Sequence, residues 1–178
     1  MWYQISERQG DILSYMNLSL EADLMPKTHA GGGEADIVYK YSKTADYPAH
    51  DLLIEATLAD STNQRRMEME PVSRHLGEYL CNNNEKKAYC IFLTNFLNIN
   101  VISDFRTRKN SIYYGVNGEK ILGMNITPME TDLLIEILKM NIKYKQLYKV
   151  FQQHFESNLE PKEWYQELER KISKSSKN

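Results

Sequence analysis

The chain has 178 residues, of which 26% are charged and 42% hydrophobic, and its formal net charge is −2. This length suits one ordinary domain with a sizeable core and is short for two, so we expect one domain over residues 1–178. No stretch approaches the roughly 18 to 20 apolar residues that a membrane helix needs, and residues 1–10 lack the basic-then-apolar order of a signal peptide. These features argue against a membrane protein and predict a cytoplasmic location.

The charge is unevenly distributed along the chain. Residues 1–60 hold ten acidic side chains against four Lys or Arg, whereas the remainder holds 18 basic and 14 acidic ones. Neutralisation of phosphates supplies most non-specific affinity for DNA. A chain this close to neutral should therefore bind DNA weakly by itself, unless its positive charges gather on one face.

The first half of the chain predicts a helix, two strands and a second helix. Residues 11–25 space their apolar side chains near the helical period and end before a proline. Residues 35–42 and 51–59 are apolar runs of strand length separated by a polar segment, which indicates a hairpin or meander. A helix is predicted over 61–80, although Pro71 could mark its true start.

The next segments predict a buried strand with a helix on each side of it in the chain. Residues 88–95 form a continuous apolar run, which suits a strand parallel to its neighbour across the preceding helix. A short helix is expected over 100–110 and a further strand over 120–126. The order of these elements predicts an α/β fold with a mixed sheet flanked by helices.

The C-terminal part, residues 127–178, is predicted to be helical. Thr127 suits the N-cap and Pro128 the first helical position, and a glutamate three residues after Thr127 completes a capping box. We expect a helix over 127–155 and another around Trp164.

Two acidic residues lie on the predicted hairpin strands. Asp36 begins the first strand and Glu55 lies late in the second, so antiparallel pairing would bring them to one end of the sheet. The parity of the register would decide whether they share a face. Mg²⁺ prefers hard oxygen ligands, commonly one or two carboxylates completed by water and phosphate oxygens. The pair predicts a magnesium site; the alternative is two solvated acids beside a flexible glycine turn at residues 31–33.

Three segments resemble a known family of nucleases. The segments HAGGGEADIVYKY (29–41), DLLIEAT (51–57) and QRRMEMEPVSRHL (64–76) are similar to the catalytic domains of type IIS restriction and nicking endonucleases of the AlwI-like group. These have a PD-(D/E)xK-type nuclease core, and the likeness is greatest to the small cleavage subunit of a heterodimeric enzyme. The resemblance implies a restriction-endonuclease-like mixed β-sheet flanked by α-helices.

The resemblance also implies roles for particular acids. Asp36 and Glu55 would hold Mg²⁺, with the backbone carbonyl of Ala56 as a further ligand. An outer acid is expected at Glu68 or Glu70. An extra acid that such cores often carry matches Glu21, on the predicted first helix.

One position departs from the pattern of the family, because the lysine expected two residues after the second acid is Thr57. A threonine hydroxyl can hold a water molecule but carries no positive charge. Lys40, Lys43 or Arg65 could supply that charge from nearby. A catalytically inactive relic is the alternative.

Contacts with DNA are expected from a small set of residues around this site. The histidine at position 75 could also face the metal or DNA, and the lysines of the C-terminal helices could contact phosphates. Each of these residues could instead be an ordinary surface or core residue. The expected contacts are His29, Gly32, Lys40, Arg65 and Arg74.

The resemblance implies a type II site-specific deoxyribonuclease of a restriction-modification system. It would use Mg²⁺ to hydrolyse phosphodiester bonds in one strand of double-stranded DNA. The chain has no recognisable sequence-reading motif, so a larger nicking-endonuclease subunit is expected to provide recognition and to be required for double-strand cleavage. Two alternatives remain open, a non-catalytic docking subunit of a nuclease complex and a stand-alone structure-specific nuclease.

Overall fold

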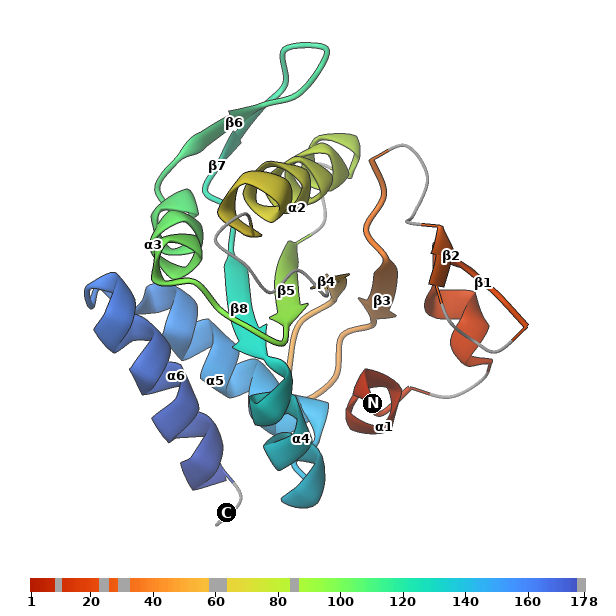
Figure 1. Ribbon diagram of the computed structural model, residues 1–178, viewed down its shortest axis with the longest axis vertical. Helices are drawn as coiled ribbons and strands as arrows, with labels where there is room; N and C mark the ends of the chain where they lie inside the picture. The colour runs from red at the N-terminus through yellow and green to blue at the C-terminus, as the bar shows by residue number, and fades with distance from the viewer. Residues whose placement is uncertain (9–10, 23–25, 29–32, 58–63, 84–86, 176–178) are drawn as a thin grey trace.

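The computed structural model describes residues 1–8, 11–22, 26–28, 33–57, 64–83 and 87–175, and for 26–28 and 64–68 only the backbone. Figure 1 shows the arrangement of the helices and strands. In chain order they are α1 (Trp2–Ile5), the 3₁₀ helix η1 (Ile12–Tyr15), β1 (Ser19–Leu20), β2 (Pro26–Thr28), β3 (Ile37–Tyr41), β4 (His50–Thr57), α2 (Gln64–Asn82), β5 (Ala88–Thr94), α3 (Ile99–Arg108), β6 (Ile112–Tyr114), β7 (Lys120–Leu122), β8 (Ile126–Glu130), α4 (Thr131–Lys139), α5 (Tyr144–Glu156) and α6 (Pro161–Ser175).

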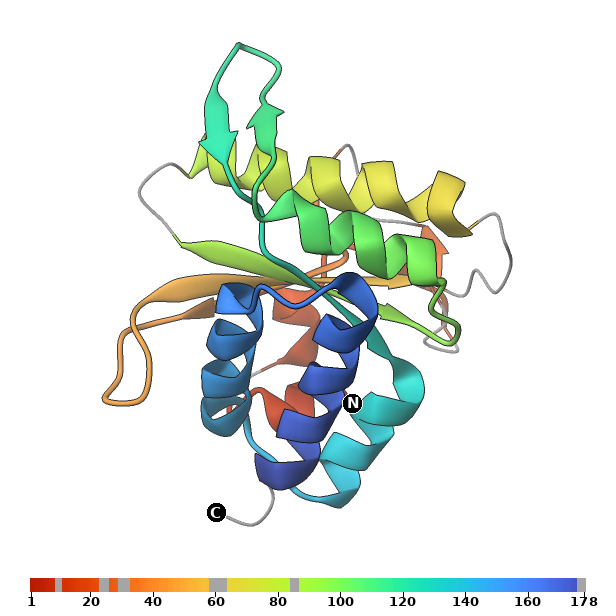
Figure 2. The same cartoon turned by 90° about the vertical axis from the view of Figure 1, so that its left-hand side faces the viewer.

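A four-stranded mixed sheet forms the centre of the fold. Its order is β3-β4-β5-β8, with β3 antiparallel to β4 and the other pairs parallel. Helices α2 and α3 cover one face, and α1, α4, α5 and α6 cover the other (Figure 2). The hairpin of β3 and β4, the crossover through α2 and the parallel strand β5 confirm the predicted mixed α/β fold. In the described ranges, no helix has the length and apolar character that crossing a bilayer requires.

Strand β4 is buried from both sides, which explains its continuous apolar run. Leu53 faces the core under α2 and α3, whereas Leu52 and Ile54 face the core under the C-terminal helices. Side chains alternate along a strand, so Glu55 points to the same side as Leu53. The second acid is therefore carried on the face that α2 covers.

The helix predicted over residues 11–25 is not formed. The Asp11 side chain accepts from the backbone N–H of Leu13 (2.9 Å) and starts only the single 3₁₀ turn η1. Asn17 then bonds to the segment before β3, since its side chain donates to the carbonyl of Ala35 (2.8 Å). These side-chain and strand contacts outweigh the helical spacing, and residues 19–20 pair with 26–28 as a small separate sheet.

The predicted start of the C-terminal helical part at residue 127 is also wrong. Thr127 and Pro128 lie in β8, where Thr127 is fully buried. Proline is tolerated there because β8 is at the edge of the sheet and pairs with β5 alone. The strand predicted over 120–126 is split between β7 and β8, and the helix begins at Thr131. The long helix is interrupted near Asn141, which has a φ of +53°.

Helix α2 runs through Pro71 without ending there. The proline lies two turns inside the helix, where it leaves one backbone carbonyl without its usual donor. The prediction of a helix over most of 61–80 is confirmed within the described residues, and the alternative start at Pro71 is not taken.

A buried histidine joins α5 to α6. The His154 ring stacks on Trp164 with 3.8 Å between ring centroids, and the Trp164 indole N–H donates to the carbonyl of His154 (2.8 Å). Among the residues that the structure describes, neither ring nitrogen of His154 has a hydrogen-bond partner. Burial, and after it the charges of Lys171, Arg106 and Lys109, together lower the pKa of His154 to about 3.

We expect His154 to make the fold sensitive to acid. An unfolded histidine titrates near pH 6.5, so the unfolded chain takes up a proton as the pH falls below that value while the folded chain does not. Stability should therefore fall from about pH 6.5 towards pH 3 by an amount on the order of a few kcal/mol. Across this pH range, the thermal midpoint of His154→Phe should depend less on pH than the midpoint of wild type. The control is Glu156→Gln, on the exposed side of the same helix. If the thermal midpoints of all three proteins change equally with pH, the expectation is wrong.

Candidate active site

Asp36 and Glu55 lie together at one end of the sheet. The register pairs Ile37 with Ile54, so Asp36, just before β3, comes beside Glu55 near the end of β4. The same parity puts both carboxylates on the α2 face, which settles the question that the sequence leaves open. Each is only 7% exposed. The Asp36 Oδ2 accepts from the backbone N–H of Ala56 (3.1 Å), which holds this carboxylate across the two strands.

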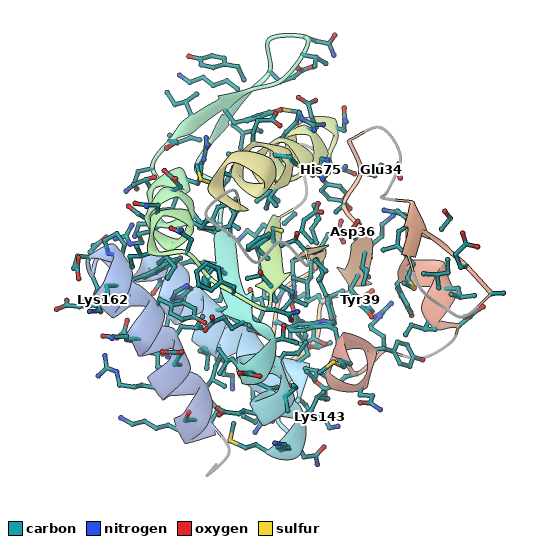
Figure 3. The ribbon with its side chains drawn as sticks, viewed as in Figure 1. Glu34, Asp36, Tyr39, His75, Lys143 and Lys162 are labelled. Carbon is teal, nitrogen blue, oxygen red and sulfur yellow. The ribbon has the colours of Figure 1, made fainter. Side chains whose placement is uncertain are left out.

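His75 approaches the two acids from α2 (Figure 3). Its Nδ1–H donates to Glu55 Oε1 over 2.7 Å. Helix α2 lies over the same face of β4 further along, since one turn beyond His75 the hydroxyl of Tyr79 donates to Asp51 Oδ2 (2.8 Å). Two polar contacts thus join one side of α2 to one face of β4.

The electrostatics of the pair depend on burial and on His75. Burial raises the pKa of Glu55, the hydrogen bond and charge of His75 oppose that rise, and the neighbouring Asp36 carboxylate adds to it. Directly beneath lies Cys90, whose thiol pKa is held well above its usual range by burial and then by Glu55 and Asp36. Two buried carboxylates with a thiol and a histidine around them form a site where a cation would be strongly stabilised.

The oxygen atoms at this site suit a hard cation. One oxygen of Asp36 is bonded to Ala56 and one of Glu55 to His75, so each carboxylate keeps a second oxygen. Among the described residues, no group of three or more His, Cys, Asp or Glu side chains is arranged to hold a metal. Two carboxylates are nevertheless the usual protein contribution to a Mg²⁺ site, because water and phosphate oxygens complete its octahedron. The two carboxylates therefore fit a Mg²⁺ site whose other ligands would be water and phosphate oxygens.

Several other predicted residues lie around this pair. Thr57 is the last residue of β4, two after Glu55, and is therefore on the same face. Arg74 bonds to Glu70 (2.9 Å), whose side chain is 69% exposed, and the choice of Glu68 or Glu70 as the outer acid stays a prediction. The guanidinium of Arg74 lies next to Gly33, whose φ of +97° explains a glycine in this turn.

The structure places the predicted lysines away from the acids. Lys40 pairs with Asp51 at the opposite end of the two strands, and four residues of strand put it about 13 Å from Asp36. Lys43 follows β3 at that same far end. The expectation that either lysine replaces the missing motif lysine is therefore wrong, because antiparallel pairing carries both away from Glu55.

Glu21 is not on a helix, contrary to the prediction. It is exposed and follows β1 in the small separate sheet. His29 and Gly32 lie outside the described residues, as do the side chains of Arg65 and Glu68 on α2. Their predicted roles remain predictions.

The basic run at residues 106–109 has a structural role. Arg106 donates from Nε to the carbonyl of Leu159 (3.2 Å), and Lys109 Nζ donates to the carbonyl of Ser157 (2.7 Å). Both cations hold the loop between α5 and α6 against α3. These contacts do not favour a role for this run in binding phosphates.

The family is decided by comparison with known proteins. A model of the AlwI restriction endonuclease family matches residues 1–137. The chain belongs to this family. The matched part of this AlwI family member contains the described segments that carry Asp36, Glu55 and His75.

One solved structure supports the same fold. It is the small subunit (R.BspD6I2) of the heterodimeric restriction endonuclease R.BspD6I, with a TM-score of 0.58 and 20% sequence identity over 93% of this chain and 81% of that one. This likeness confirms the restriction-endonuclease-like architecture. A search among curated proteins found no significant match.

His75 is the neighbour of the acids that sequence reasoning undervalued, since the pattern favoured an ordinary core histidine. Its position on α2, next to Leu76 and one turn before Tyr79, was the available indication that it faces the sheet. The contact with Glu55 depends on how α2 crosses β4, which helical periodicity alone does not reveal.

Proposed function

We propose that this AlwI family member is a type IIS restriction endonuclease subunit that hydrolyses one strand of double-stranded DNA with Mg²⁺. The observation that carries the proposal is the pairing of Asp36 and Glu55, both buried, on one face at one end of the sheet. Buried acids without a bound cation repel each other, so their pairing favours a cation-binding role over a structural one.

Asp36 and Glu55 would hold Mg²⁺, with the carbonyl of Ala56 as a predicted further ligand. When bound, the ion would polarise the scissile phosphate and lower the pKa of a water molecule. His75 keeps Glu55 ionised and oriented through its 2.7 Å hydrogen bond. Thr57, on the same face, can position a water molecule through its hydroxyl.

Arg74 is placed to take part of the role of the missing lysine. Its guanidinium lies beside Gly33, three residues before Asp36, and its side chain is 42% exposed. An incoming phosphate near Asp36 could displace Glu70 from Arg74, because an exposed ion pair contributes little stability. Guanidinium groups bind phosphate oxygens in a fixed two-pronged geometry.

A larger recognition subunit is the proposed partner. The structural relative is, by its title, the small subunit of a heterodimeric enzyme. In this chain the hairpin of β6 and β7 projects beyond α2 (Figure 1) and exposes an apolar surface. This hairpin surface consists of Ile112, Tyr114, Val116 and Leu122, which are 44%, 64%, 85% and 76% exposed.

The hairpin surface is a suitable docking site for that subunit. Ile112 and Leu122 are directly opposite each other, whereas Tyr113 on the other face donates its hydroxyl to Glu78 of α2 (2.6 Å). The hairpin is thus anchored on one side and apolar on the other. Exposed apolar patches of this kind mark protein interfaces.

Plasmid cleavage in Mg²⁺ tests the proposed function. The chain alone is expected to cut supercoiled plasmid poorly, and the addition of its larger nicking subunit should give linear DNA. Efficient sequence-specific cleavage by the isolated chain would remove the need for a partner. Cleavage of branched or single-stranded DNA without a partner would instead favour a stand-alone structure-specific nuclease.

Changing the hairpin surface should separate docking from chemistry. We expect Tyr114→Lys combined with Val116→Asp to reduce linear product at least tenfold at limiting partner, because two charges would be buried in an apolar interface. Thermal stability should be unchanged, since both side chains are exposed. The control is Ile12→Lys combined with Leu13→Asp, which alters exposed apolar residues of η1 by the same charges. Equal linear product from both double variants would refute docking on the hairpin.

A further inference from the structure

A groove lies between α5 and α6, away from the acids. It encloses about 400 Å³, and four lysines line it. Lys145 and Lys149 are one turn apart on α5, and Lys171 and Lys174 are one turn apart on α6. The two helices are antiparallel, because Gln146 bonds near the end of α6 while His154 meets its beginning. The four ammonium groups therefore come from adjacent turns at one end of the helix pair.

The positive charge of this groove is poorly compensated. Lys171 pairs with Glu167 at 3.4 Å. Across the described residues, the ammonium groups of Lys145, Lys149 and Lys174 form no ion pair, and Asp46 is the single carboxylate that lines the groove. Like charges on successive turns of a helix are destabilising. A chain whose net charge is only −2 thus places four cations in one groove, and three of them are outside any ion pair among the described residues.

We propose that this lysine groove binds the phosphate backbone of duplex DNA away from the scissile bond. Lysine suits this role as a compact point charge. The remaining lining includes Gln153, whose side-chain amide can act as a neutral hydrogen-bond partner. The groove recognises charge without reading sequence, in agreement with recognition by another subunit.

The composition of the lining favours a duplex over other polyanions. It contains no aromatic side chain on which the bases of a single strand could stack. It also contains no Arg, Trp or Tyr, the residues that anchor protein interfaces, whereas lysine is depleted from them. An acidic protein surface is therefore the less favoured occupant.

The groove lies on the opposite face of the sheet from His75 and α2, as Figure 2 shows for the helices that form it. Figure 3 marks Lys143, directly before α5, near this end of the helix pair, and Lys162 at the other end of α6. The lysines therefore affect how DNA is held, not the cleavage of the bond. The proposal rests on the proposed function only in taking DNA as the substrate.

Binding without metal tests the groove separately from cleavage. The full chain would be titrated into a 30-base-pair duplex of arbitrary sequence in EDTA, at several salt concentrations. The test variant is Lys145→Gln with Lys149→Gln and Lys174→Gln. The control is Lys87→Gln with Lys139→Gln and Lys162→Gln, which removes equal charge from exposed sites elsewhere.

The test variant is expected to bind at least about tenfold more weakly at low salt, with a salt slope smaller by about two to three because each lost phosphate contact contributes about 0.9. The control should stay within about threefold of wild type. The proposal would be overturned if both variants lost equal DNA affinity, or if wild type did not bind the duplex at low salt. It would also be overturned if the test variant kept its DNA affinity and lost only its binding to the larger subunit. If the test variant binds DNA more weakly as expected but wild type never cleaves DNA with its partner, the proposed cleavage function is wrong and the proposed DNA-binding role of the groove is supported.

Discussion

Asp36→Asn and Glu55→Gln should each abolish the linear product that we expect the chain to give with its proposed larger partner, leaving nicked circles. Loss of either carboxylate would remove charge that we propose holds Mg²⁺, and such an ion supplies several kcal/mol of transition-state stabilisation. A loss of about 4 kcal/mol corresponds to roughly a thousandfold in rate. The rate of linearisation of supercoiled plasmid should therefore fall by at least about a thousandfold in either variant.

Stability measurements distinguish loss of the metal from loss of the fold. Asp36 and Glu55 are buried like charges, and Asp36 raises the pKa of Glu55, so Glu55→Gln should not lower the thermal midpoint in EDTA. Mg²⁺ should raise the midpoint of wild type and leave that of both variants unchanged. Glu156→Gln, which removes an exposed carboxylate on α5, should cleave normally. If both acid variants linearise plasmid as well as wild type, the metal site is misassigned and a docking role takes its place.

His75→Leu should lower cleavage about 10- to 100-fold and move the acidic limb of its pH profile to higher pH. The magnitude is typical of residues that orient a metal ligand. The direction follows from Glu55, whose pKa burial raises and the hydrogen bond from His75 lowers. Without His75 the pKa of Glu55 rises further, so protonation removes the charged ligand at a higher pH. Activity should accordingly recover in part when the assay pH is raised.

Matched variants separate this positioning role from general damage to α2. Tyr79→Phe removes the neighbouring hydrogen bond to Asp51 from the same helix and should leave the pH profile in place. His75→Asn, whose side-chain amide can still donate to Glu55, should restore part of the rate and shift the profile less. A uniform loss at every pH in His75→Leu, without a shift, would indicate that His75 acts on packing alone.

The chemistry of the site could be predicted from residues near each other in the sequence. The acids at positions 36 and 55 stand on two apolar runs, and the polar segment between the runs already indicates antiparallel strands. The glycine run before Asp36 indicated a turn, and Gly33 adopts a left-handed conformation there. Such features depend on local spacing and backbone sterics, which a sequence states directly.

Other features depended on contacts between distant segments. Thr127 and Pro128 match a helix start, yet β5 recruits them as an edge strand. Residues 11–25 have helical spacing, yet Asn17 ties them to Ala35. Lys40 seemed close to Asp36 but is carried to the far end of the hairpin, whereas His75 is brought to Glu55 by the path of α2.

The sequence by itself therefore determined the fold class and indicated the two acids of the candidate site. Only the tertiary structure decided that the acids share a face, that His75 joins them and that the lysines of α5 and α6 meet in one groove. Periodicity describes which side of an element is apolar, but the register between strands and the crossing of helices arise from packing across long separations in the chain. Those packing energies are absent from any short window of sequence, so they can override its local preference.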